Sequence, residues 1–132
     1  MTVVDYDGLA DVLADTDILV MILPHHPSTA NAMNAERFAQ LKPGALVVNV
    51  GRGSTVDEQA LVDALRSGHL AGAAIDVTAT EPLPPESPLW DEKNLLITPH
   101  VAGGRPQNGD KLLAQNIDAV RTGGEIRNLV RR

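Results

Sequence analysis

The 132-residue sequence predicts an α/β fold in which a parallel sheet of about four strands alternates with helices. The prediction rests on short continuous apolar runs, on helical patterns between them, and on turn residues that close both. A run that is apolar throughout, with no polar alternation, is typical of a parallel strand buried on both faces. Such runs occur at 18–23, 45–50, 73–77 and 95–98.

Segments with helical spacing of apolar residues lie between and beside these runs. The clearest extends from Val56 to Arg66, where Thr55 and Glu58 have the spacing of a capping box and Gly68 marks the end. Further helical patterns occur at 9–13, 34–41 and 112–120, and a proline-rich surface loop is expected at 82–88. Strands that alternate with helices predict right-handed crossover connections.

Composition narrows the possible partners. Hydrophobic residues make up 43% and charged residues 21% of the chain, which is typical of a globular domain. A net charge of −6, without a basic tract and with one residue each of Trp, Tyr and Phe, argues against nucleic-acid binding. The longest apolar stretch is too short to cross a membrane, so no membrane partner is expected. The absence of cysteine excludes disulfides and fits a cytoplasmic location.

Three chemically different polar residues each follow one of the apolar runs. These are Arg52, Glu81 and His100, and in an open α/β sheet the strand ends are where ligands bind. A cation can bind an anion, an acid can orient a histidine, and an imidazole can move a proton. Each could instead be an ordinary surface or turn residue. We favour the catalytic interpretation because all three follow strands.

Asp76 and the pair His25–His26 invite other interpretations. Asp76 is an acid inside an apolar run, and burying it without a partner would be costly. It therefore either caps backbone groups or faces a ligand, and we favour the ligand. Adjacent histidines rarely chelate one ion well, so we expect solvated loop histidines and no metal site.

The order of these segments resembles the D-isomer-specific 2-hydroxyacid dehydrogenases. That family includes glyoxylate and hydroxypyruvate reductases, phosphoglycerate dehydrogenase and formate dehydrogenase. The resemblance covers nearly the whole chain, and its main segments are 22–24, 41–45, 48–52, 56–58, 81–83, 87–90, 98–103 and 124–130. It implies a partial Rossmann-type, doubly wound parallel sheet and NAD or NADP as cofactor. The glycine-rich turn that opens such a sheet is not found in this sequence.

The resemblance also implies roles for individual residues. Arg52 would bind the carboxylate and polarise the carbonyl of a 2-keto acid, His100 would donate the proton, and Glu81 would pair with His100. Asp76 would hydrogen-bond the nicotinamide carboxamide. The cofactor is expected to contact Leu23, Pro24, Val50, Gly51, Arg52, Asp76, His100, Val101, Ala102 and Gly103.

Family members are more than twice as long as this chain. The resemblance therefore implies the C-terminal part of an NAD(P)-binding domain, with residues from about 123 to 132 forming a return segment toward a substrate domain. The expected function is an NAD(P)-dependent oxidoreductase that interconverts a 2-keto acid and a D-2-hydroxy acid, as a truncated fragment and a homodimer. The alternatives are a nucleotide-sensing binding module and a catalytically inactive fragment.

Overall fold

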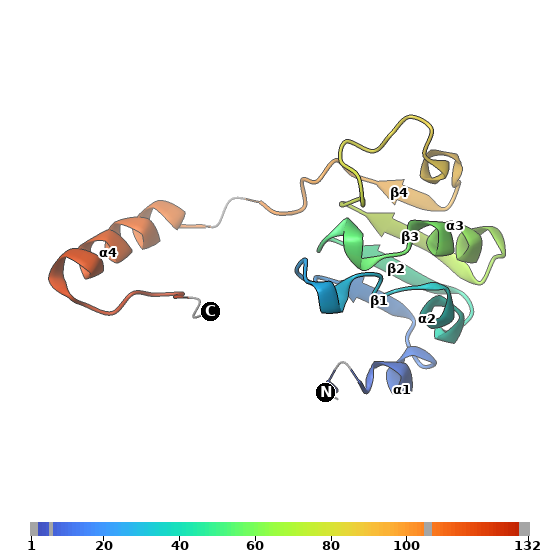
Figure 1. Ribbon diagram of the computed structural model, residues 1–132, viewed down its shortest axis with the longest axis horizontal. Coiled ribbons are helices and arrows are strands. Elements are labelled where there is room, and N and C mark those ends of the chain that lie inside the picture. The colour runs from blue at the N-terminus through green and yellow to red at the C-terminus, as the bar shows by residue number, and fades with distance from the viewer. Residues whose placement is uncertain (1–2, 6, 105–106, 130–132) are drawn as a thin grey trace. The chain divides into compact units, whose positions relative to one another are not determined.

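The computed structural model describes residues 3–5, 7–104 and 107–129 (Figure 1). The chain forms two compact units, Met1–Ala102 and Gly103–Arg132. The first contains α1 (Leu9–Leu13), β1 (Ile18–Met21), α2 (Ala35–Gln40), β2 (Ala45–Asn49), α3 (Glu58–Arg66), β3 (Leu70–Ile75), β4 (Leu95–Ile97) and the short 3₁₀ helices Pro27–Thr29, Gly53–Thr55 and Pro88–Asp91. The second contains α4 (Gly109–Thr122). Among the described helices, none is long and apolar enough to cross a membrane.

The four strands form one parallel sheet in the order β1-β2-β3-β4. Asn49 at the end of β2 pairs with Ile75 at the end of β3, which in turn pairs with Ile97 at the end of β4. The carboxyl ends of these strands therefore reach the same edge of the sheet. The predicted α/β fold with four parallel strands that alternate with helices is confirmed.

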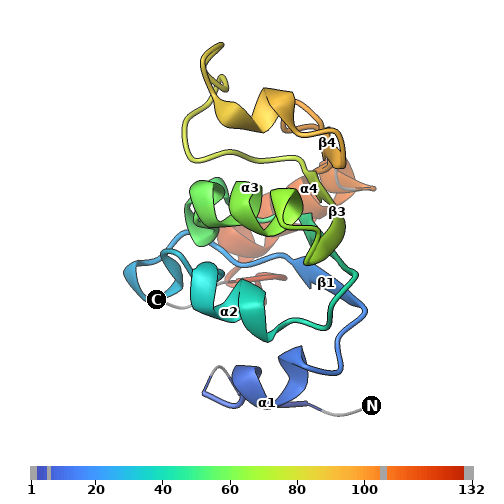
Figure 2. The same cartoon turned by 90° about the vertical axis from the view of Figure 1, so that its right-hand side faces the viewer.

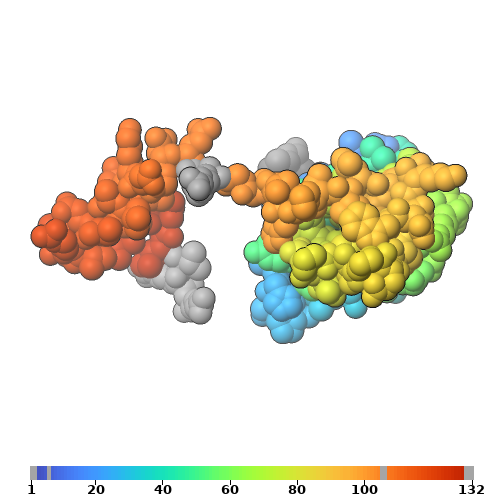
Figure 3. Space-filling model, turned by 90° about the horizontal axis from the view of Figure 1, so that it is seen from above, coloured from blue at the N-terminus to red at the C-terminus, as the bar shows by residue number. Residues whose placement is uncertain are grey.

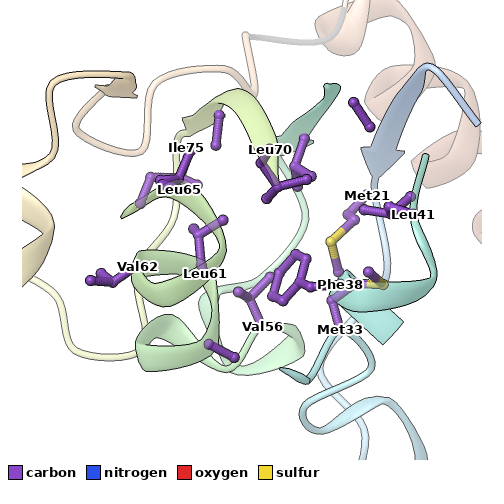
Figure 4. Packing of buried hydrophobic residues seen from close by; sticks show 14 of the residues in the cluster. Met21, Met33, Phe38, Leu41, Val56, Leu61, Val62, Leu65, Leu70 and Ile75 are labelled. Atoms are coloured by element: carbon purple, nitrogen blue, oxygen red, sulfur yellow. The ribbon is translucent and has the colours of Figure 1, made fainter. Parts of the chain in front are cut away.

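One face of the sheet is buried by α2 and α3, which lie side by side in front of the strands in Figure 2. Phe38 of α2 and Leu61 of α3 are almost fully buried, and Phe38 lies at the centre of the labelled side chains in Figure 4. Val47 of β2 and Leu70 of β3 belong to the same cluster. The first unit thus has its own core, which fixes the strands that lead to the polar residues.

The opposite face of the sheet carries exposed apolar side chains. Ile18 and Val20 of β1 are 58% and 56% exposed, and Leu46 of β2 and Leu96 of β4 are also exposed. The prediction that the runs at 18–23 and 45–50 are buried on both faces is therefore wrong. The reason is that the helices of the first unit pack against the other face. β1 is moreover an edge strand of this sheet, and it ends at Met21.

The start of α3 also differs from the prediction. Asp57, and not Thr55, caps the helix: its side chain accepts a hydrogen bond from the backbone N–H of Ala60 at 3.1 Å. Glu58 does not close a capping box, because its carboxylate accepts the backbone N–H of Ala79 at 2.6 Å. A contact between distant segments has therefore replaced the local pairing that the spacing predicted.

The second unit is a single helix followed by a turn. α4 extends beyond the predicted 112–120 at both ends, and Gly123 ends it with a φ of 71°. The side-chain amide of Asn116 exchanges two hydrogen bonds with the backbone of Arg127, at 3.1 and 3.0 Å, so the following segment folds back along the helix. The predicted return segment is described only as far as residue 129, and its relation to a substrate domain stays a prediction.

The cap of α3 can be tested by replacing Asp57. Asp57→Ala should lower the free energy of unfolding by about 1 kcal/mol, because the backbone N–H of Ala60 loses its acceptor. Urea unfolding of the 132-residue chain measures the change. Asp57→Asn keeps an acceptor oxygen and should change stability by only a few tenths of a kcal/mol. Equal losses in both variants would show that Asp57 is not acting as a cap.

Candidate active site

The loops that carry the polar residues leave the sheet side by side. The backbone pairing continues one residue past the strands: the N–H of Asp76 donates to the carbonyl of Asn49, and the N–H of Thr98 donates to that of Ile75, both at 2.9 Å. The segments that lead to Arg52, Glu81 and His100 therefore start from one line across the sheet edge. This is the arrangement expected for a ligand site in a parallel sheet.

Two buried side chains fix the backbone at Arg52. Asn49 is 1% exposed; its Oδ1 accepts the N–H of Gly51 at 3.0 Å, and its Nδ2 donates to the carbonyl of Arg52 at 3.1 Å. The hydroxyl of Thr55 donates to the same carbonyl at 2.6 Å. The sequence interpretation missed both residues. For Asn49 the available signal was a polar residue at the end of an apolar run, since buried polar groups need partners.

Glycines on both sides of Arg52 allow main chain to pack against main chain. A Cβ on Gly51 would lie 2.7 Å from the carbonyl oxygen of Leu23, and a Cβ on Gly53 would overlap the backbone of Thr78. No side chain fits at either position without movement of a neighbouring backbone. The structure thus brings Leu23 and Gly51, both predicted cofactor-binding residues, into contact.

The Arg52 side chain is exposed to solvent above these contacts. Its Nη1 donates to the carbonyl of Gly51 at 2.6 Å, and in the described part of the chain it forms no ion pair with a carboxylate. Its positive charge contributes to lowering the pKa of Glu81. The remaining guanidinium N–H groups can therefore bind an anion, and a planar fork suits a carboxylate.

His100 and Glu81 form a hydrogen-bonded pair. Nδ1 of His100 lies 2.7 Å from Oε2 of Glu81, and the other carboxylate oxygen accepts the backbone N–H of Thr78 at 3.1 Å. The hydrogen bond from His100, followed by that from Thr78, holds the pKa of Glu81 below its ordinary range. Because an ionised carboxylate only accepts, Nδ1 carries the proton and Nε2 is the nitrogen left to face a substrate. The His100 side chain is 47% exposed.

Further contacts hold the loop that carries Glu81. The carboxylate of Glu58 on α3 accepts the N–H of Ala79, and the indole of Trp90 donates to the carbonyl of Pro84 at 2.9 Å. The loop lies on the surface of the first unit, as expected for the proline-rich segment, and is yellow in Figure 3. No local pattern predicts the contact with Glu58, which is 21 residues from Ala79 in the sequence.

Asp76 caps backbone groups. It is buried, and its carboxylate accepts hydrogen bonds from the Thr98 hydroxyl and from the N–H groups of Val101 and Ala102. This is the first of the two interpretations considered for it, and a contact with a ligand stays a prediction. Gly103, also predicted to contact the cofactor, is the first residue of the second unit.

A cavity of about 670 Å³ opens beside the His100–Glu81 pair, within the size range of small-molecule sites. It is lined by Asp76, Thr78, Glu81, Pro82, Leu83, Trp90, Ile97, Thr98, Pro99 and His100.

The two histidines that were predicted to be solvated loop residues do not line this cavity. His25 contacts the hydroxyl of Ser54, and His26 accepts the backbone N–H of Ser28. The described residues include no cluster of three or more potential metal ligands.

Residues 1–102 match the family model described as "D-isomer specific 2-hydroxyacid dehydrogenase, NAD binding domain". The match covers the same span as the first compact unit and contains Arg52, Glu81 and His100. The sheet edge with its three polar loops therefore falls within the part of the chain that defines the family.

Individual relatives agree with this match. D-3-phosphoglycerate dehydrogenase of Escherichia coli K12 is 48% identical over 99 residues, which are 72% of this chain and 24% of that enzyme. A D-isomer specific 2-hydroxyacid dehydrogenase from Xanthobacter autotrophicus Py2, solved with NADPH and MES, is 45% identical with a TM-score of 0.87, over 95% of this chain and 52% of that one.

An NADPH-dependent glyoxylate/hydroxypyruvate reductase from Sinorhizobium meliloti, solved with NADP and sulfate, is 35% identical with a TM-score of 0.88. The match covers 96% of this chain and 42% of that one. The chain thus spans about half, or less, of the length of these relatives. The fold, the matched residues and the relatives agree, and the chain belongs to the D-isomer specific 2-hydroxyacid dehydrogenase family, of which it carries NAD-binding domain sequence.

Proposed function

We propose that this chain supplies the carboxylate-binding and proton-transfer residues of a dehydrogenase that interconverts a small 2-keto acid and a D-2-hydroxy acid. The observation that carries the proposal is the 2.7 Å hydrogen bond between His100 and Glu81, whose loops lie beside the loop of Arg52. Among the described residues, Arg52 forms no ion pair with a carboxylate. The family match and a relative named as a glyoxylate/hydroxypyruvate reductase support glyoxylate or hydroxypyruvate as substrate. The homodimer and the cytoplasmic location stay predictions.

The proposed chemistry uses the exposed guanidinium of Arg52 and Nε2 of His100. The guanidinium of Arg52 binds the substrate carboxylate and polarises the adjacent carbonyl. As the carbonyl carbon gains a hydride and its oxygen gains negative charge, Nε2 of His100 gives that oxygen a proton, which yields the hydroxyl. Glu81 keeps the ring oriented through Nδ1 and stabilises its positive charge before the transfer. In the reverse direction His100 takes the proton back.

The sheet edge fits a nicotinamide cofactor, which supplies or removes the hydride when bound. The segments after β1 and β2 form a close main-chain contact at Leu23 and Gly51, which has no side chain to separate them. Pro24 and the half-exposed Val50 provide apolar area beside it. We place the nicotinamide against this surface, with Arg52 and His100 on the side of the substrate.

The function is tested on the 132-residue chain by titration with NADH and NADPH, followed by a glyoxylate or hydroxypyruvate assay. We expect cofactor binding, seen as a change in nicotinamide fluorescence, and oxidation of the cofactor that depends on the keto acid. Binding without turnover would favour a nucleotide-sensing module. The absence of both would favour a catalytically inactive fragment.

Replacement of His100 separates proton transfer from cofactor binding. His100→Gln should lower kcat by about 10²- to 10⁴-fold, because the proton donor is lost, while the Kd for NADPH changes by less than about threefold. Steady-state rates and fluorescence titration measure the two quantities. His69→Gln, a histidine after α3 and outside the site, is the matched control. Turnover close to that of the unmodified chain in His100→Gln would exclude the proposed role.

Replacement of Arg52 tests the bidentate contact. Arg52→Lys keeps the charge but loses the planar fork, and kcat/KM for the keto acid should fall about tenfold to a hundredfold. Arg66→Lys, which changes an arginine in a surface ion pair with Glu92, provides the control and should leave kcat/KM unchanged. If the two variants behave alike, Arg52 does not bind the substrate carboxylate.

The lowered pKa of Glu81 predicts a pH dependence of stability. A carboxyl whose pKa is lower in the folded state stabilises the fold above its unfolded pKa and loses this effect as the pH falls through the folded pKa. The stability difference between the unmodified chain and Glu81→Gln should therefore be full above about pH 5 and shrink below about pH 4. Asp76 has a lowered pKa as well, so the variant keeps part of the acid sensitivity.

Urea midpoints of both proteins between pH 3 and 6 measure this difference. Glu86→Gln changes an exposed acid of the same loop and serves as the control. A stability difference for Glu81→Gln that stays constant over the whole pH range would contradict the assignment of the ionised Glu81 as the partner of His100.

A further inference from the structure

The carboxylate of Asp76 holds the chain on both sides of His100. Its Oδ1 accepts the hydroxyl of Thr98 at 2.5 Å and the N–H of Val101 at 2.9 Å, and its Oδ2 accepts the N–H of Ala102 at 2.9 Å. Asp76 itself is fixed in the sheet, since its N–H donates to the carbonyl of Asn49. A side chain that directly follows a strand thus ties down the segment from 98 to 102.

Three hydrogen bonds compensate for the burial of the Asp76 carboxylate. Asp76 is 4% exposed, and a buried carboxylate is tolerated only when hydrogen bonds replace its hydration. The Thr98 hydroxyl, followed by the N–H groups of Ala102 and Val101, lowers the pKa of Asp76 despite its burial. Charge-assisted hydrogen bonds of this kind are about twice as strong as neutral ones. Asp76 is therefore a strong anchor for the loop.

His100 needs such an anchor because of its backbone. Its φ is 55°, in the left-handed region that residues other than glycine adopt at a cost of about 1–3 kcal/mol. A residue remains in that region only when its surroundings impose it. The contacts of Thr98, Val101 and Ala102 with Asp76 lie within two residues of His100 on both sides, where they can impose this conformation.

We propose that Asp76 is a positioning residue for His100: it fixes the 98–102 segment so that the imidazole meets Glu81, and it does so before any ligand is bound. Its catalytic consequence rests on the proposed function of His100, but the effect on the loop does not. A carboxylate has about four lone-pair directions, so Oδ2 can still accept one more donor. A ligand amide can therefore share the carboxylate with Ala102 without displacing the loop.

The test uses the 132-residue chain without cofactor and compares it with Asp76→Asn. The amide of the variant has one acceptor oxygen and one NH₂ group, so at least one donor from the loop loses its partner. Hydrogen exchange at the N–H groups of Val101 or Ala102 should accelerate by about tenfold to a hundredfold. The ¹⁵N shifts of the neutral His100 ring should move from a protonated Nδ1 toward a mixture of tautomers.

Control variants separate the effect on the loop from other effects. Asp91→Asn makes the same chemical change on the surface and should alter neither readout. Glu81→Gln removes the ionised partner of His100 but leaves the carboxylate of Asp76, so exchange at Val101 and Ala102 should remain slow. Because exchange does not depend on turnover, failure of the proposed enzymatic function leaves this measurement intact.

A second pair of variants covers the case in which Asp76→Asn does not fold. Thr98→Val removes only the hydroxyl donor and should shift the His100 ring toward a mixture of tautomers. Thr98→Ser keeps a hydroxyl donor and should leave the ring protonated at Nδ1, as in the unmodified chain. A residue that served only to bind the cofactor would leave the loop unchanged in the cofactor-free chain. Unchanged exchange in Asp76→Asn, or an unchanged His100 ring in Thr98→Val, would therefore overturn the proposal.

Discussion

The parallel pairing of β2, β3 and β4 in register is the constraint on which the candidate site depends. Asn49, Ile75 and Ile97 occupy one line across the sheet, and the backbone pairing continues for one residue beyond it. The loops that follow β2, β3 and β4 therefore all begin at the same edge of the sheet. Three residues that are 29 and 19 positions apart in the sequence, Arg52, Glu81 and His100, can act together because of this alignment. The core of α2 and α3 stabilises the alignment from one face.

Hydrogen bonds from buried side chains hold the backbone of the loops that follow the strands. Asn49 and Thr55 fix the backbone of Arg52, whereas Asp76 fixes the segment around His100. These residues satisfy backbone groups that would otherwise have no partner away from water. The side chains of Arg52 and His100, for which chemical roles are proposed, remain exposed, whereas Asn49, Thr55 and Asp76 are buried. The site thus has a rigid base and an accessible surface.

The sequence was sufficient for features that depend on local pattern and insufficient for those that depend on distant contacts. The apolar runs predicted the strands, and the turn residues after them located Arg52 and His100. The predicted capping box at Thr55 does not form, because Glu58 accepts the N–H of Ala79 instead. Ala79 lies in a distant loop, and the spacing of residues in the sequence does not predict that this loop contacts α3. The prediction that the first apolar run is buried on both faces was wrong, because apolar residues alone do not show whether a helix covers each face of the sheet.

The two polar groups proposed to meet the substrate are held by different kinds of contact. Arg52 stands between glycines whose backbone touches the backbones of Leu23 and Thr78, and this main-chain packing adds to the hydrogen bonds from Asn49 and Thr55 to its carbonyl. His100 is held by hydrogen bonds to side chains, each of which a single codon change can remove. Loss of one neighbouring side chain therefore leaves the main-chain packing at Arg52 in place, whereas loss of the Glu81 carboxylate removes the hydrogen bond that orients the His100 ring. The orientation of the imidazole is thus more sensitive to a single substitution than the course of the backbone at Arg52.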